Sequence, residues 1–427
     1  MSKAYEYEPQ FKKTVLSNGT RVVTEHHPYS RATSAGIYID MGSRDEPKHL
    51  NGAAHFIEHL AFKGTHKRNA YEIVKEIESV GGELNAYTAR EYTCFHACTL
   101  KEHLPISMDV LSDLVSDALF QIEEFNKERQ VVLQEIMMSA DELEEYIFDL
   151  YFEQAYPGNS LSNPILGTNE SLNGMNRDEL FKFYQDRYKA EHLIVSVAGA
   201  VDHDEVVKLV EKNLLLKSEK SVQFSRSLPE MKVFKQFYKK DTEQVHYLLG
   251  LPSSSFKSKN RFDSYVVNAF LGGGMTSQLY QKIREDKALA YSVYSYLQSF
   301  TDSGLMMFYV GTSENYIEQV SQMVFDEVKS LKEKSISQEQ LDFYKRQVKG
   351  QIMLGADDVE NRMNSLAVNE MVFGEYRPVD HVVNEIDKVT TDSVSGYLDK
   401  YFDFTKAGCL LLGKCEKSLQ DQVFSLI

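Results

Sequence analysis

The segment FYQDRYKAEHLIVSVAG, residues 183–199, has a pattern that returns in the second half of the chain. Two tyrosines four residues apart precede an apolar run that ends in glycine. The segment YLDKYFDFTKAGCLLLG, residues 397–413, repeats this order. Each copy is typical of a helix end, a short turn and a buried strand. Because the copies lie about half of the 427-residue chain apart, we predict a duplicated domain with two divergent halves.

Local patterns around these copies predict a mixture of strands and helices. Residues 33–43 and 245–252 have the composition of strands, whereas residues 70–80 have the spacing of an amphipathic helix. Residues 123–154 lack proline and glycine and repeat apolar residues every three or four positions, which predicts one long helix. We therefore expect an α+β fold with two homologous domains, each an antiparallel sheet with helices packed on one face.

A polar segment marks the boundary between the halves. KSEKSVQFSRS, residues 217–227, holds four serines and leads into Pro229, as a linker does. We expect an N-terminal domain over residues 1–216, a linker over residues 217–231 and a C-terminal domain over residues 232–427.

The composition describes a folded protein and limits its partners. Hydrophobic residues make up 42% and charged residues 26%, and the formal net charge is −16. This acidity argues against non-specific nucleic-acid binding. The most apolar run, residues 193–201, is about half as long as a membrane span. Four cysteines are too few for a disulfide framework, and the first residues lack the apolar run of a secretory signal, so we expect a cytoplasmic protein with no membrane partner.

The pentapeptide HFIEH carries the sharpest chemical signal. On a helix, His55 and His59 lie one turn apart on the same face, so both imidazoles can meet one metal ion. Glu58 lies beside them, where its carboxylate can reach a metal-bound water without being a ligand. This H-x-x-E-H order is the inverzincin signature. The alternative is an ordinary histidine pair on a helix surface.

A catalytic zinc site typically needs a third protein ligand. Glu128 and Glu135 are seven residues apart on a predicted helix, which places them on nearly the same face. Either both are solvated, as glutamates on helices usually are, or one is a ligand. Apolar neighbours around Glu135 suit a partly buried carboxylate, which needs a partner such as a metal.

Four motifs in order resemble one family of peptidases. They are HFIEHLAFKGT (residues 55–65), GGELNAYTAREYT (81–93), ERQVVLQEI (128–136) and LGGGMTSQLYQKIREDKALAYSVYS (271–295). Together they resemble the inverted-zincin metallopeptidases that include mitochondrial processing peptidase, pitrilysin and insulin-degrading enzyme. The length is most like that of the single-chain bacterial processing-peptidase-like members, which form one half of a clamshell.

The resemblance implies a role for each residue of the centre. His55, His59 and Glu135 would be the ligands of a Zn²⁺ ion, and Glu58 would be the general base. Glu128 would orient the site from outside the ligand set.

The resemblance also implies substrate contacts. Asn85 and Ala86 would lie on an edge strand of a hairpin and pair with an extended peptide, although the residues alone favour an ordinary hairpin. Gly273 and Gly274 would lie in a glycine-rich loop near the substrate cleft. That loop lacks the lysine of a phosphate-binding loop, so it is weak evidence for a nucleotide.

The second half supplies a further expected pair. Arg284 and Tyr291 match the family's Arg/Tyr pair, which would hold substrate and stabilise the developing oxyanion. Gln278 stands where the family commonly has Arg, and Ala288 where it commonly has Gly. In the family, the H-x-x-E-H motif and this pair meet across the chamber between opposing clamshell halves. The resemblance therefore implies a homodimer, or a heterodimer with a related subunit, in which one chain completes the site of the other.

A second set of metal-binding residue types alternates along the expected hairpin. Cys94, His96 and Cys98 fall on one face of a strand, but packing is the favoured interpretation because cysteine is commonly buried as a small hydrophobe.

Taken with the resemblance, the residues predict a zinc metalloendopeptidase acting on unfolded peptides, with basic or presequence-like peptides as candidate substrates. The alternative is a catalytically silent assembly or interaction subunit of the same fold. A metal-dependent hydrolase of small molecules is weaker, because an edge-strand hairpin would have no use there.

Overall fold

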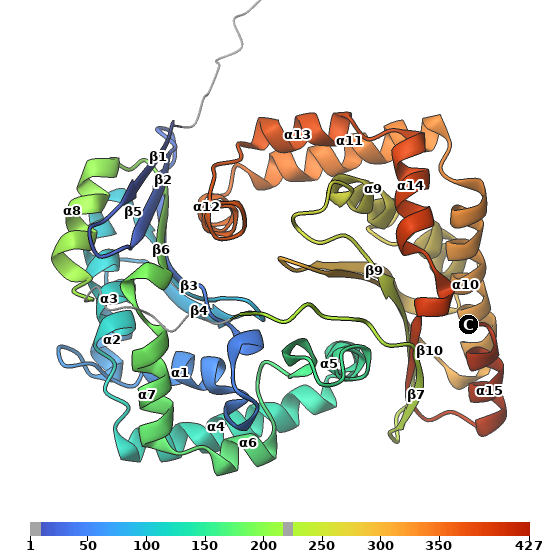
Figure 1. Ribbon diagram of the computed structural model, residues 1–427, viewed down its shortest axis with the longest axis horizontal. Coiled ribbons are helices and arrows are strands. Elements are labelled where there is room, and N and C mark those ends of the chain that lie inside the picture. Colours follow the sequence, from blue (N-terminus) through green and yellow to red (C-terminus); the bar gives the residue numbers. More distant parts are fainter. Residues whose placement is uncertain (1–9, 217–224) are drawn as a thin grey trace, which may run out of the picture. The chain divides into compact units, whose positions relative to one another are not determined.

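The computed structural model describes residues 10–216 and 225–427, which form two compact units (Figure 1). The first unit comprises residues up to 136, residues 164–226 and residues 354–377; the second comprises residues 137–163, 227–353 and 378–427. Each unit is a sheet with packed helices, so the expectation of an α+β chain with two related domains is confirmed. Of the expected linker, residues 217–224 lie outside the described residues.

The first unit is built on a six-stranded sheet in the order β1-β2-β6-β3-β5-β4. The strands are β1 (Gln10–Val15), β2 (Arg21–His26), β3 (Ala32–Ile39), β4 (Glu83–Thr88), β5 (Thr93–Leu100) and β6 (Leu193–Gly199). The sheet departs from the fully antiparallel expectation in one pair, because β2 and β6 run parallel. Strands β3 to β5 and most helices of the first half lie between β2 and β6 in the sequence, and such a long connection allows a parallel neighbour.

Helices cover both faces of this sheet. They are α1 (Ala53–Ala61), α2 (Ala70–Glu78), α3 (Leu104–Ser116), most of α4 (Ile122–Asp141), α6 (Asn169–Gly174), α7 (Arg177–Arg187), α8 (His203–Asn213) and α12 (Val359–Phe373). The main core joins α1 and α3 to one face of β3, β5 and β6. On the opposite face, α12 packs alone in a smaller core against β2, β3 and β6 (Figure 1). The expectation that helices pack on one face only is therefore wrong for α12, which covers the other face.

The second unit repeats the plan with a five-stranded sheet in the order β7-β11-β8-β10-β9. Its strands are β7 (Phe234–Lys239), β8 (Val245–Pro252), β9 (Ala290–Ser299), β10 (Gly304–Thr312) and β11 (Gly408–Gly413), and β7 and β11 are its parallel pair. Its helices are α5 (Leu143–Ala155), α9 (Arg261–Leu271), α10 (Ile317–Lys334), α11 (Gln338–Gly355, up to residue 353), α13 (Val379–Asp387), α14 (Thr391–Tyr401) and α15 (Lys417–Ser425). Here α5 packs on the sheet face opposite α9, α10 and α14.

The two halves of the sequence exchange one helix each. α5 comes from the first half but packs on β8 and β11, and α12 comes from the second half but packs in the first unit. The packing units thus differ from the expected domains, 1–216 and 232–427, in the segments 137–163 and 354–377. The domain boundaries remain a prediction about how the chain was duplicated.

The predicted long helix over residues 123–154 is wrong in one respect. The chain forms α4 and α5, with a break at Glu142, whose ψ of 77° is not helical. Val132 of α4 packs in the core of the first unit, whereas Ile147 of α5 packs in the second. A single straight helix would serve only one of these cores.

Among the described helices, none is long and apolar enough to cross a membrane.

Candidate metal centre

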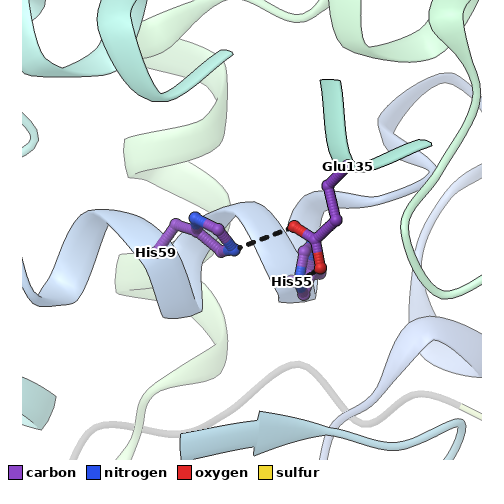
Figure 2. A group of neighbouring side chains, drawn as sticks. All are labelled: His55, His59 and Glu135. Carbon is purple, nitrogen blue, oxygen red and sulfur yellow. Dashed lines mark ion pairs between the residues drawn. The ribbon is translucent and has the colours of Figure 1, made fainter. Parts of the chain in front are cut away.

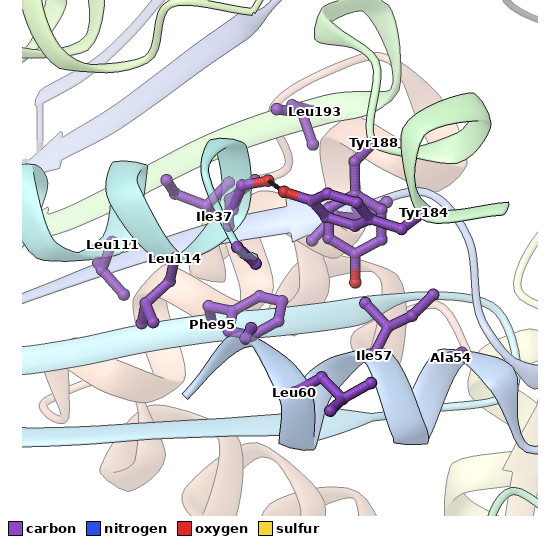
Figure 3. Close-up of a cluster of buried hydrophobic side chains, with 14 of the residues drawn as sticks. Ile37, Ala54, Ile57, Leu60, Phe95, Leu111, Leu114, Tyr184, Tyr188 and Leu193 are labelled. Carbon is purple, nitrogen blue, oxygen red and sulfur yellow. Dashed lines mark hydrogen bonds between the residues drawn. The ribbon is translucent and has the colours of Figure 1, made fainter. Parts of the chain in front are cut away.

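Helix α1 presents one face to the core and another to the candidate centre. Ala54, Ile57 and Leu60 recur every third residue and are fully buried in the main core, and Figure 3 shows Ile57 pointing from α1 toward Tyr188. This packing fixes the rotation of the helix about its axis. The histidines of H-x-x-E-H consequently lie on the other side of α1.

The N-terminus of α1 is held by Glu46, which was not predicted as a site residue. Its carboxylate accepts hydrogen bonds from the backbone N–H groups of Gly52 (2.8 Å) and Ala54 (2.7 Å) and from Asn51 Nδ2 (3.1 Å). Burial raises the pKa of Glu46 to about 8, although these donors act in the opposite direction. The acid stands six residues before Gly52, outside the usual capping position, so no local capping pattern reveals it.

His55, His59 and Glu135 converge as the sequence predicted. One ligand atom from each lies within 4.8 Å of the others, and the described residues contain no other such group of three. His59 Nε2 lies 3.4 Å from one carboxylate oxygen of Glu135, and His55 Nε2 lies 3.8 Å from the other (Figure 2). Figure 2 also shows that α1 supplies both imidazoles, whereas the carboxylate reaches in from α4.

The protonation preferences of His55 and Glu135 suit a metal site. Burial, reinforced by the neighbouring His59, lowers the pKa of His55 and keeps its ring neutral. The hydrogen bond to His59 lowers the pKa of Glu135 and keeps it ionised. Two imidazoles and one carboxylate are a donor set that zinc accepts, with a position left for water. The residues present therefore fit a Zn²⁺ ion.

Glu128 touches the centre through His59. Its carboxylate lies 3.2 Å from His59 Nδ1 and 2.8 Å from Lys63 Nζ, and it is only 5% exposed. Burial lowers the pKa of His59, but the bonds to Glu135 and Glu128 outweigh burial and raise it. When Nδ1–H donates to Glu128, the lone pair of Nε2 faces Glu135. Lys63 was not predicted, because its effect on the centre is indirect.

Glu58 lies on α1 but outside the group of three. Its Oε2 accepts a 2.6 Å hydrogen bond from Thr88 Oγ1 on β4. Burial raises the pKa of Glu58, and the bond from Thr88 opposes the shift. A carboxylate with a raised pKa and one fixed oxygen is suited to accept a proton. Thr88 was missed as a site residue, although it is two residues beyond Ala86 and so shares its face of the strand.

Asn85 and Ala86 lie on β4, which is the edge strand of its sheet. They pair with His96 and Phe95 of β5, and β4 has no other neighbour among the described strands. The expected hairpin is present, and its outer edge is a place where an extended peptide can pair. Peptide binding by these two residues remains a prediction.

Arg284 and Tyr291 come together in the second unit, whereas the metal-binding group lies in the first. Arg284 belongs to a π-helical segment, η6 (Tyr280–Glu285), and its Nη1 donates to the backbone oxygen of Tyr291 at 2.9 Å. The guanidinium lies 4.3 Å from the centre of the Tyr291 ring, which is 75% exposed. The predicted pair is therefore a contact, and its catalytic role stays a prediction.

The glycine-rich loop follows α9. A side chain on Gly273 would lie 2.7 Å from Ala269 Cα, and Gly274 has a φ of +158°. Ala288 has a φ of +50°, in the left-handed region that favours glycine, which explains why glycine suits this position. Two residues before Gln278, the backbone oxygen of Thr276 accepts a 2.8 Å hydrogen bond from the Tyr344 hydroxyl. The roles of the two glycines in substrate binding remain predictions.

Cys94, His96 and Cys98 do not join the candidate metal group found among the described residues. Cys94 is fully buried in the core beneath α12, and burial raises the pKa of its thiol. These observations support packing as the role of Cys94.

Comparison with known proteins places the sequence in one family. The model of the insulinase family, peptidase family M16, matches residues 21–169, and the model of the peptidase M16 inactive domain matches residues 174–348. The uncharacterized zinc protease YmxG of Bacillus subtilis is 37% identical over 391 residues, which cover 92% of this chain and 95% of YmxG. The chain belongs to the insulinase family.

Other insulinase-family relatives have similar lengths. An uncharacterized zinc protease of Streptomyces coelicolor is 37% identical over 90% of this chain and 85% of its own length. Two solved structures share the fold. A protease from Helicobacter pylori has a TM-score of 0.87 at 23% identity and covers 95% of this chain and 100% of its own. A peptidase M16 inactive domain from Pseudomonas fluorescens has a TM-score of 0.87 at 14% identity, covering 95% and 98%.

Proposed function

We propose that the chain is a zinc metalloendopeptidase of the cytoplasm that hydrolyses unfolded peptides. One observation carries the proposal: His55, His59 and Glu135 form a compact donor set, and Glu58 stands beside it as a carboxylate that is not part of the set. The names of the relatives, which are zinc proteases, support the same metal and reaction.

Each residue of the centre has a chemical task. His55, His59 and Glu135 would hold the Zn²⁺ ion, which when bound lowers the pKa of water and polarises a carbonyl. Glu58 would take a proton from the attacking water and return it to the leaving amine. Thr88 holds one oxygen of Glu58 and leaves the other free for this transfer. Glu128 keeps His59 in the tautomer that binds metal through Nε2.

An extended peptide substrate would pair through its backbone with the outer edge of β4. Backbone pairing at Asn85 and Ala86 selects extended, unfolded chains and is indifferent to most side chains. Gly273 and Gly274 would let a peptide approach the loop closely. The net charge of −16 is compatible with basic peptides.

The test is hydrolysis of a pool of quenched basic and neutral peptides by the wild type and by Glu58→Gln, with zinc content measured on the same samples. We expect cleavage by the wild type, loss of cleavage in the variant, and equal zinc in both. Removal of zinc by a chelator should abolish cleavage, and added zinc should restore it. Zinc binding without cleavage by the wild type would point to a missing partner subunit or a narrow substrate, and the absence of zinc would favour the silent-subunit alternative.

We further propose a homodimer, or a heterodimer with a related subunit, in which Arg284 and Tyr291 of one chain face the metal centre of the other. Mixing Arg284→Ala chains with Glu58→Gln chains should restore part of the activity, since a mixed dimer contains one centre with neither substitution. No recovery in dimers verified to be mixed would contradict this assembly.

A further inference from the structure

The strand that carries Thr88 is held from both of its faces. Successive side chains of a strand point to opposite sides. Thr88 points to α1 and hydrogen-bonds Glu58, whereas Tyr87 packs with the core beneath α12. As an edge strand with one neighbour, β4 has half the backbone pairing of a central strand, so side-chain contacts matter more for its position.

The contact on the α12 side is a hydrogen bond to Asn364. Tyr87 Oη donates to Asn364 Oδ1 at 2.9 Å. Tyr38, on the central strand β3, donates its hydroxyl to the same oxygen. One carboxamide oxygen thus ties the edge strand to the middle of the sheet.

Helix α12 is a firm support for Asn364. The neighbouring Arg362 makes two 2.7 Å hydrogen bonds to the carboxylate of Glu25 on β2, and both side chains are buried. Ser196 of β6 donates to the backbone oxygen of Met363 at 2.7 Å. α12 is therefore anchored on β2 and β6, neither of which adjoins β4, and Asn364 links it to Tyr87 of β4.

We propose that Asn364 and Tyr87 are positioning residues of the metal centre. By fixing Tyr87, Asn364 fixes the next residue, Thr88, and with it the free oxygen of Glu58. The proposal rests on the proposed peptidase function. It assigns to a helix from the second half of the sequence a part in aligning the base in the first unit. A small misalignment of a reacting group is costly, so the effect should fall mainly on kcat.

The test uses two pairs of variants, and each pair consists of a test variant and its matched control. Tyr87→Phe removes the bond from the edge strand, and Tyr38→Phe removes the bond from the central strand to the same oxygen. Asn364→Leu removes the acceptor, and Asn364→Asp keeps it. We expect kcat to fall about tenfold in Tyr87→Phe and Asn364→Leu, with KM changing less than about threefold and zinc content unchanged. Tyr38→Phe and Asn364→Asp should stay near wild type.

Hydrogen exchange of the β4 amides gives a readout that does not depend on activity. Exchange over Glu83–Thr88 should quicken in Tyr87→Phe and Asn364→Leu only. If kcat falls equally in Tyr38→Phe and Tyr87→Phe, or falls in Asn364→Asp as much as in Asn364→Leu, the contact contributes only to general packing. Either result would overturn the proposal. If the wild type cleaves no peptide, the proposed function fails, and the exchange pattern alone decides whether Asn364 positions the strand.

Discussion

At the scale of single residues, Glu128 acts on the proposed centre through a hydrogen bond. Its oxygen faces His59 Nδ1, and Lys63 holds the other oxygen. Partners of this kind typically contribute ten- to a hundredfold to metal affinity. We expect Glu128→Ala to weaken zinc binding about tenfold or more, measured by competition with a chromogenic chelator. Glu124→Ala, one turn earlier on α4 and paired with Lys127 at the surface, is the control and should leave affinity unchanged.

The backbone of Ala288, between Arg284 and Tyr291 in the sequence, is slightly strained. Its φ of +50° costs a residue with a Cβ about 1 kcal/mol, and glycine avoids that cost. We expect Ala288→Gly to raise the free energy of unfolding by about 0.5–1 kcal/mol, observed as a higher midpoint of thermal unfolding. Gly374→Ala should do the opposite, because Gly374 has a φ of +69° with open space around it. A destabilised Ala288→Gly chain would contradict this reading of the turn.

At the scale of elements, α12 is attached to its sheet by a buried ion pair. Burial alone would raise the pKa of Glu25, but the hydrogen bonds from Arg362 and His27 outweigh it and lower the pKa to about 2. A carboxyl whose pKa is lowered by folding stabilises the protein above its ordinary pKa of 4.5 and loses that contribution as the pH falls toward 2.

The stability advantage of wild type over Glu25→Gln should therefore shrink by about 2 kcal/mol between about pH 5 and pH 3. Urea unfolding followed by circular dichroism measures both chains at each pH. Glu375→Gln removes an exposed acid that pairs with Arg377, and its difference from wild type should change little over this range. A gap for Glu25→Gln that stays constant with pH would mean that the carboxyl is not the titrating group.

Elements were predictable where the signal is local. Spacing alone places His55 and His59 on one face of a helix, and apolar runs mark β6 and β8. The break at Glu142 left no trace, because its φ of −85° and ψ of 77° suit many residues and need neither proline nor glycine. Thr88 and Asn364 were missed because each acts across a long sequence separation, and Glu46 was missed because it lies outside the usual capping position. The sequence pattern of residues 359–373 is compatible with a helix, but it does not reveal which sheet the helix covers.

At the scale of the whole molecule, the helix exchange makes the two halves of the sequence depend on each other. In the first unit, α12 covers a sheet face formed by buried side chains such as Val23, Tyr38 and Ile194. In the second unit, Ile147 and Tyr151 of α5 are fully buried. Burying a large apolar side chain contributes about 1.5–3 kcal/mol. The burial free energy lost with either helix is therefore comparable to the whole free energy of unfolding of a typical domain, about 5–15 kcal/mol.

Cutting the chain within residues 217–224 tests this dependence. Fragment 1–216 would keep α5 without its sheet and lack α12, and fragment 225–427 would have the converse defect. We expect each fragment expressed alone to aggregate or to bind a hydrophobic dye, and the two co-expressed fragments to purify as a one-to-one complex. As a control, full-length protein cleaved in this segment after folding should stay associated. A fragment 1–216 that is monomeric by itself, with protected β6 amides, would show that the first sheet is stable without α12 and that the exchange is not needed for folding.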